Sequence, residues 1–383
     1  MKTLIKNALI HDSIHREPFA GDILISEGKI ERIAPSVECA DAAVYDAQGR
    51  RAYAGFIDAH SHLGLAGYGI GYEGTDYNEM NDIITPHLRG IDGFKPMQPP
   101  LEHASHAGVT TVCVGPGSAN VLGGTFFAVK TVGRCVDDMV VRNPIAMKCA
   151  FGENPKRCYR DKCDTSRMTT AAKLREMLFK AREYERKIVA AGDDESKLPA
   201  FDMKLEALRP VIRGELPLKA HAHATEDIFT AIRIAREFGC KLTLEHVTEG
   251  HLIVEELAKA GYPCAVGPSL GDASKWELRN KSFTTPGILA RAGIQVSIIT
   301  DADVIPQEYL PLCAGLAVKS GMDPFDALQA ITINPAKHAG IEDRVGSLEA
   351  GKDADIVIAD GDPFEVSTEI CAVFINGRNI LAS

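Results

Sequence analysis

The sequence predicts an α/β protein with a (β/α)8 TIM-type barrel and a small β-sandwich domain formed by both termini. Three observations favour this fold class. The chain has 383 residues, which suits one barrel of roughly 250 residues plus an accessory unit. Its middle part alternates short apolar runs with helical stretches, the pattern of a parallel sheet. Several of these runs end in histidine or aspartate, as they do when a barrel builds a site at the carboxyl ends of its strands.

The two ends of the chain each have the pattern of a small β unit. Residues 22–33 contain two strand patterns joined by a Glu-Gly turn, which indicates a hairpin. Near the other end, an apolar run leads into Asn376-Gly377, a strong turn dipeptide. Neither end is long enough to bury a core alone. We therefore expect residues 1–52 and 345–383 to combine into the β-sandwich, and residues 53–344 to form the barrel.

The barrel strands are predicted from continuous apolar runs, which are typical of strands covered on both faces. Eight runs qualify, near residues 54–60, 109–114, 125–132, 144–150, 217–222, 241–246, 262–267 and 294–300. The third run fits a loop equally well, because two glycines precede it. Helical patterns cover residues 169–191 and 226–238, with Thr225 as the expected cap and Gly239 as the stop of the second helix.

Bulk composition excludes several classes of function. Forty-two basic against 52 acidic residues give a net charge of -10, so we expect no nucleic-acid partner. No run approaches the roughly 18 consecutive apolar residues of a membrane span, and the N-terminus lacks the apolar core of a signal peptide. The ten cysteines show no disulfide framework, and Cys158 and Cys163 have no second pair nearby that would complete a zinc site. We expect a cytoplasmic protein with reduced thiols.

The strongest chemical signal is His60 and His62, two residues apart at the end of the first barrel strand. Residues at this spacing project from the same face of a strand, so the two imidazoles can share one cation. An isolated pair of this kind is often structural, but this one follows Gly-Phe-Ile-Asp and precedes a glycine-rich run. Asp58 lies on the same face and is expected to orient a ligand histidine.

Three further strand ends carry candidate ligands. His221 and His223 repeat the spacing at the fifth strand, where we expect one to bind metal and the other to face substrate. His246 closes the sixth strand, and alternation puts Glu245 on the opposite face, where a structural role is expected. Asp301 ends the eighth strand, and a metal ion is its expected partner because an isolated buried charge is very costly. A helix cap or loop turn is the alternative role for this aspartate.

Lys148 lies in an apolar strand between two small same-face neighbours, Ala146 and Ala150. Buried lysines are rare, and burial favours the neutral amine. A neutral amine can react with carbon dioxide to form a carbamate, which is an anionic oxygen ligand for two metals. Two alternatives stay open: Lys148 binds a substrate anion, or Glu153 in the following loop is the carboxylate ligand.

Substrate contacts are expected from two loops at the same end of the barrel. Arg157 or Arg160 would hold a substrate carboxylate, since a guanidinium makes two parallel hydrogen bonds to it. An exposed, solvated loop is the competing interpretation. Tyr72, in the loop after the first strand, is expected to line the substrate pocket.

These motifs together resemble the amidohydrolase superfamily over almost the whole chain. The segment from Gly55 to His62 is similar to the first-strand motif of the family, with Ala54 where a proline is usual. Residues 345–357 are similar to its C-terminal segment. The chain looks closest to the branch that groups imidazolonepropionase-like enzymes with Xaa-Pro-type dipeptidases.

The resemblance implies a metal-dependent hydrolase with one or two divalent cations, zinc before manganese or iron. Lys148 matches the lysine that is carboxylated in two-metal members. Deaminases and imidazolonepropionases of the superfamily tend to carry a glutamate three residues after the strand-five histidine, where this chain has Ala224. This departure favours two metals. The implied ligands are His60, His62, Lys148, His221, His246 and Asp301.

We therefore expect hydrolysis of a C–N bond in a small-molecule amide, dipeptide or cyclic amide. Asp301 would act as general base and then acid, and His223 or a second metal would polarise the carbonyl. The alternative is a single-metal deaminase or imidazolonepropionase-type hydrolase. A metal-free scaffold is a third hypothesis, disfavoured because every expected ligand type is present. The expected partners are a small-molecule substrate and further copies of the chain in a homo-oligomer.

Overall fold

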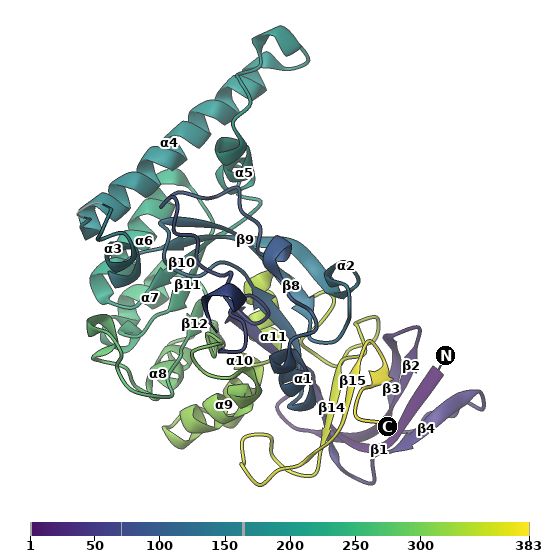
Figure 1. The fold of residues 1–383 in the computed structure, drawn as a ribbon. Helices are drawn as coiled ribbons and strands as arrows, with labels where there is room; N and C mark the ends of the chain where they lie inside the picture. Colours follow the sequence, from purple (N-terminus) through teal and green to yellow (C-terminus); the bar gives the residue numbers. More distant parts are fainter. Residues whose placement is uncertain (1, 70, 163–164, 383) are drawn as a thin grey trace.

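The structure is a computed structural model that describes residues 2–69, 71–162 and 165–382. Its strands form two sheets of eight strands each. One sheet forms the centre of the molecule with helices around it, and the other lies beside it with strands from both ends of the chain (Figure 1).

The elements follow one another along the chain in these positions. The terminal sheet contains β1 (Lys2–His11), β2 (Phe19–Ser26), β3 (Lys29–Ala34), β4 (Ala42–Asp46), β5 (Arg51–Ala54), β14 (Ile356–Ala359), β15 (Ile370–Ile375) and β16 (Arg378–Asn379). The central sheet contains β6 (Phe56–Ser61), β7 (Val109–Val114), β8 (Leu122–Lys130), β9 (Val140–Ala150), β10 (Leu218–Ala222), β11 (Leu242–His246), β12 (Cys264–Val266) and β13 (Val296–Ile298). The helices are α1 (Pro99–His106), α2 (Val136–Met139), α3 (Glu153–Cys158), α4 (Arg167–Ala191), α5 (Met203–Ile212), α6 (Thr225–Phe238), α7 (Val254–Ala260), α8 (Thr285–Arg291), α9 (Leu310–Lys319), α10 (Pro324–Ala330) and α11 (Ile333–Ala339).

The terminal sheet is mixed, and β1 lies inside it, paired with β2, β4 and β5. Both predicted hairpins are present, as β2–β3 and β15–β16. Their turn residues have positive φ, as two-residue hairpin turns require: 51° and 79° for Glu27 and Gly28, 47° and 74° for Asn376 and Gly377. Residues from both ends of the chain share one hydrophobic core on this continuous sheet. Strand β5 extends to Ala54, past the predicted boundary at residue 52.

The central sheet is a nearly closed barrel with the strand order β13-β12-β11-β10-β9-β8-β7-β6. Each of the eight predicted strand positions contains one of these strands. The expectation of an all-parallel sheet needs one correction, because β8 runs antiparallel to β7 and β9. Only residues 115–121 connect β7 to β8, and a parallel crossover needs about a dozen residues or more.

The helices cover the outside of the barrel, and α4 and α5 form an arm that projects from it (Figure 1). The predicted helix at residues 169–191 is α4. Helix α6 ends at Gly239 in the left-handed conformation (φ 70°), as predicted. Its predicted cap is wrong, because Thr225 is the first helical residue and makes no side-chain cap. The carboxylate of Glu249 accepts the Thr225 backbone N–H at 2.9 Å instead.

A buried ionic cluster joins the barrel to the terminal sheet. Lys130 lies at the end of β8, and its Nζ is 3.2 Å from Oδ2 of Asp353 and also contacts Asp355. Arg344 donates to the same Asp353 oxygen at 2.7 Å. A buried charge is stable only with such partners, so the segment before β14 completes the environment of a barrel strand.

Two further expectations concern membrane-spanning helices and the cysteine pair. Among the helices of the described residues, none is both long and apolar enough to cross a membrane. Cys163 lies outside the described residues, so the expectation that Cys158 and Cys163 form no zinc site stays a prediction.

Candidate metal centre

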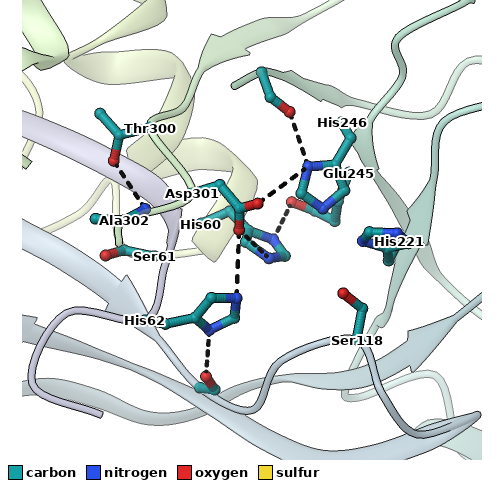
Figure 2. Close-up of polar contacts among 12 residues, drawn as sticks. His60, Ser61, His62, Ser118, His221, Glu245, His246, Thr300, Asp301 and Ala302 are labelled. Atoms are coloured by element: carbon teal, nitrogen blue, oxygen red, sulfur yellow. Dashed lines mark hydrogen bonds and ion pairs between the residues drawn. The ribbon is translucent and has the colours of Figure 1, made fainter. Parts of the chain in front are cut away.

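Histidine and aspartate side chains from four strand ends meet at one end of the barrel (Figure 2). They form two groups, and the candidate ligand atoms within each lie within 4.8 Å of one another: His60, His62 and Asp301 in one, His221, His223 and His246 in the other. Asp301 links the groups, since its Oδ1 is 3.3 Å from His62 Nε2 and its Oδ2 is 4.0 Å from His246 Nδ1. The structure thus brings together the four strand ends that the sequence singled out.

Two of these residues have an unusual backbone conformation. His246 and Asp301 have φ values of 74° and 53°, in a region that non-glycine residues rarely adopt. Leu242 and Leu244 of β11 pack outward against the helices, so strict alternation would send His246 outward too. The left-handed turn at the strand end brings it inward. Such strain is held by the surrounding structure and is typical of functional sites.

The orientation expected for Glu245 is wrong for the same reason. Alternation was counted from His246, whose left-handed conformation reverses the alternation at the strand end. The carboxylate of Glu245 lies inside the barrel, where Oε2 is 2.9 Å from Nδ1 of His60. Asp58, which we expected to orient a ligand histidine, acts on the backbone instead. It accepts the His60 backbone N–H at 2.9 Å and binds the hydroxyl of Thr300 at 2.7 Å. Asp58 thereby ties the first strand of the barrel to the last.

The histidine rings are oriented by acceptors behind them. Nδ1 of His62 lies 2.8 Å from the Gly115 carbonyl, and Nδ1 of His246 lies 2.8 Å from the Gly267 carbonyl. A carbonyl only accepts, so each Nδ1 carries the proton and each Nε2 presents a lone pair to the site. Nε2 of His246 and Nδ1 of His221 are buried without a hydrogen-bond partner within the described residues. Buried imidazole nitrogens without partners, gathered with further histidines and the Asp301 carboxylate, are a donor set that fits a divalent metal ion.

Lys148 lies directly beside the first group. Its Nζ is 3.0 Å from Nε2 of His60, and its side chain is fully buried. Burial lowers the pKa of Lys148 to about 8, although the charges of Asp301 and Glu245 oppose the shift. Glu153, the alternative ligand, begins α3 and belongs to neither group among the described residues.

Burial also controls the charge of the other side chains. It lowers the pKa of His60, His221 and His223 well below the usual value, and that of His246 to about 4. These imidazoles are therefore neutral at pH 7, as metal ligation requires. Burial opposes ionisation of Asp301, but at acid pH the protonated His246 ring and the contact with His62 outweigh it and hold the pKa of that carboxyl below its usual value.

A cavity of about 270 Å³ opens over the two groups. Of the predicted substrate contacts, Arg157 lines this cavity, whereas Arg160 is exposed and is not among its described lining residues. Tyr72 is 85% exposed and lines a neighbouring cavity of about 370 Å³. Tyr77 borders both cavities and stacks on His62 with ring centroids 5.1 Å apart.

One carboxylate of this site, that of Glu277, was not predicted from the sequence. Glu277 is buried, and its Oε1 lies 2.7 Å from Lys275 Nζ, 3.7 Å from His221 Nε2 and 3.8 Å from His223 Nε2. It belongs to a short 3-10 turn, Trp276–Leu278, in a long loop after β12 that has no strand or helix periodicity. Gly152 makes room for it, because a Cβ there would lie 2.4 Å from Oε2 of Glu277.

Comparison with known proteins identifies the family. Residues 51–380 match the model of the amidohydrolase family. "Amidohydrolase tasK" of Hapsidospora irregularis is 31% identical over 93% of this chain, which spans 39% of that relative's length. An imidazolonepropionase of Symbiobacterium thermophilum is 27% identical over 88% of this chain and 83% of its own. A crystal structure of an amidohydrolase from Thermotoga maritima MSB8 covers both chains fully, with a TM-score of 0.96 and 40% identity. This chain belongs to the amidohydrolase family.

Proposed function

We propose that this protein hydrolyses a C–N bond of a small-molecule amide, dipeptide or cyclic amide with a metal-activated water. One observation carries the proposal. Neutral imidazoles with unpartnered nitrogens, an ionised aspartate and a buried lysine of lowered pKa converge at the open end of the barrel. Family membership supports the same reaction class.

The two groups of side chains suit two divalent cations. His60, His62 and Asp301 would hold one, and His221 with His246 would hold the other. Lys148 would serve both as a carbamate: its amine lone pair attacks the carbon of carbon dioxide, and the displaced N–H proton leaves to solvent. A bound zinc ion supplies a water whose pKa falls to about 7 and polarises the substrate carbonyl.

The side chains of the protein would move the protons. Asp301 would accept the proton of the attacking water and deliver it to the leaving nitrogen as the C–N bond breaks. His223 would donate a hydrogen bond from Nε2 to the carbonyl oxygen, with Thr248, 2.7 Å from Nδ1, as the donor that fixes this tautomer. Arg157 and Tyr77 would contact the substrate across the cavity.

A single-metal deaminase or imidazolonepropionase-type reaction is the second candidate. One observation favours it. The sequence lacks a glutamate at position 224, and Glu226 is exposed, yet Glu277 supplies a buried carboxylate beside His221 and His223. After accepting the proton of the attacking water, Glu277 would be a carboxylic acid and would donate that proton to a ring nitrogen of a substrate.

Metal analysis followed by a substrate screen tests both candidates. We expect two equivalents of metal per chain, and either release of an amine from a dipeptide or an N-acyl amino acid, or ring opening of a cyclic ureide. A chelator should abolish that activity and zinc should restore it. One equivalent of metal, together with release of ammonia or opening of an imidazolone ring, would select the second candidate. Full activity after complete metal removal would contradict both.

A further inference from the structure

A second, buried network lies beneath the candidate metal centre, and all its other members contact one shared carboxylate. Glu245 projects from β11 into the barrel and is 0% exposed. Its Oε2 is 2.9 Å from His60 Nδ1 and 2.9 Å from Lys219 Nζ. Its Oε1 is 2.8 Å from His338 Nε2 and 2.7 Å from the hydroxyl of Thr243. A carboxylate can only accept, so four donors converge on it.

The contact with His60 determines which ring nitrogen is available to a metal. Because Glu245 accepts the proton of Nδ1, the Nε2 atom of His60 carries the lone pair. That atom lies 3.0 Å from Lys148 Nζ and 3.8 Å from Asp301 Oδ1, inside the first ligand group. His62 and His246 rely on neutral backbone carbonyls for the same purpose. Of these three rings, only His60 has a carboxylate as the hydrogen-bond acceptor of its Nδ1 among the described residues, and a charged acceptor makes a stronger hydrogen bond.

The other contacts hold the carboxylate in place. Lys219 is the register neighbour of Lys148 on the adjacent strand and is also buried. Of these two lysines, only Lys219 forms an ion pair with a carboxylate among the described residues. His338 comes from α11, which packs against β6 and β13 at the other end of the barrel. The carboxylate is thus held from three separate elements, and its position leaves His60 little rotational freedom.

We propose that Glu245 is a positioning residue for the metal centre: it fixes the tautomer and the orientation of His60, and Lys219 and His338 fix Glu245. The inference rests on the proposed metal centre and goes beyond it, because Glu245 itself touches neither the cavity nor the predicted ligands other than His60. Partners of this kind behind a ligand histidine typically account for about 10–100-fold in metal affinity.

Three variants separate positioning from a purely structural role. Lys219→Met alone keeps the acceptor of His60. Glu245→Gln with Lys219→Met keeps an acceptor but removes its charge. Glu245→Leu with Lys219→Met removes the acceptor while leaving no unpaired charge, an exchange that buried pairs often tolerate. All three are full-length chains, stripped of metal and reloaded with zinc against a competing chromophoric chelator.

We expect zinc affinity to depend on whether His60 Nδ1 keeps its hydrogen-bond acceptor, and not on the ion pair between Glu245 and Lys219. Lys219→Met should stay close to the parent protein, because His338 and Thr243 still hold the carboxylate of Glu245. The Gln double variant should be intermediate, and the Leu double variant should bind zinc about 10–100-fold more weakly. Urea midpoints measured on the same samples show whether each variant is folded. Equal zinc affinity in all three would overturn the proposal, and so would an equal loss in Lys219→Met and the Leu double variant. Since no substrate is used, a parent protein that binds zinc but hydrolyses nothing would refute the proposed reaction and leave this inference standing.

Discussion

The amine of Lys148 lies 3.0 Å from Nε2 of His60, and both side chains are completely buried. Glu245 holds the proton on Nδ1 of the same ring, so the amine donates to the only lone pair that His60 offers. Metal binding to His60 requires that this hydrogen bond be replaced. Conversion of the amine to an anionic carbamate would do so, because it turns a donor that competes with the metal into a ligand.

Replacement of Lys148 by alanine should reduce bound metal and turnover together. Metal ligation is worth several kcal/mol at the transition state, so we expect a loss of on the order of 10³-fold in kcat. The space left by the side chain should admit a short carboxylic acid, and propionate should restore part of the activity. Atomic absorption and initial rates with and without propionate measure both effects. Undiminished metal content in Lys148→Ala would exclude a ligand role.

Asp301→Asn should abolish proton transfer while preserving the shape of the side chain. General acid–base catalysis contributes about 10²–10⁴-fold, and kcat should fall by that factor. Asp193→Asn, on the exposed loop after α4, is the matched control and should retain the parent rate. Full turnover in Asp301→Asn would contradict its assigned role.

Arg157 and Arg160 provide a matched pair for substrate recognition, since only Arg157 is among the described residues that line the cavity. Loss of charge-assisted hydrogen bonds worth about 1.5–3 kcal/mol should raise the KM of Arg157→Met about tenfold or more for a carboxylate-bearing substrate. The same variant should differ little from the parent with the corresponding carboxamide. Arg160→Met should behave like the parent with both. Equal changes in KM for Arg157→Met and Arg160→Met would refute the assignment of Arg157 as the substrate-binding arginine.

Stability of the metal-free protein should fall as the pH is lowered from about 6.5 to about 4. The pKa of His246 is depressed in the folded state, so between these values the unfolded chain binds a proton that the folded chain does not. Stability is therefore complete above the unfolded pKa and declines below it, by on the order of 3 kcal/mol for this residue alone. Urea unfolding of chelator-treated protein across this range measures the slope. In His246→Gln the slope should be shallower, and an unchanged slope would show that another group is responsible.

The strand positions of the barrel could be predicted because the apolar runs are long and uninterrupted. The direction of β8 could not, since a buried strand has the same composition in either orientation. The length of the connection over residues 115–121 was the available signal. The cap of α6 was misjudged for another reason: the group that accepts the Thr225 N–H comes from Glu249, 24 residues away.

The convergence of the candidate ligands could be predicted where they close a strand, as at His60, His221 and Asp301. Glu245 was misjudged because alternation was extended through His246, whose left-handed conformation reverses it. Glu277 was missed because it lies in an aperiodic loop, and only the fold brings that loop over the strand ends. Patterns in sequence locate side chains on regular elements, and they carry no information about where a loop returns.

The ionic cluster around Lys130 makes the barrel dependent on the last part of the chain. Phe126, on the same strand, packs against His60 with ring centroids 5.1 Å apart. Proteolytic trimming ahead of Asp353 would leave the Lys130 ammonium in the interior without either of its counterions. Damage at the carboxyl terminus would therefore propagate along β8 to the wall of the candidate metal centre, and the barrel and the terminal sheet should melt in a single cooperative transition.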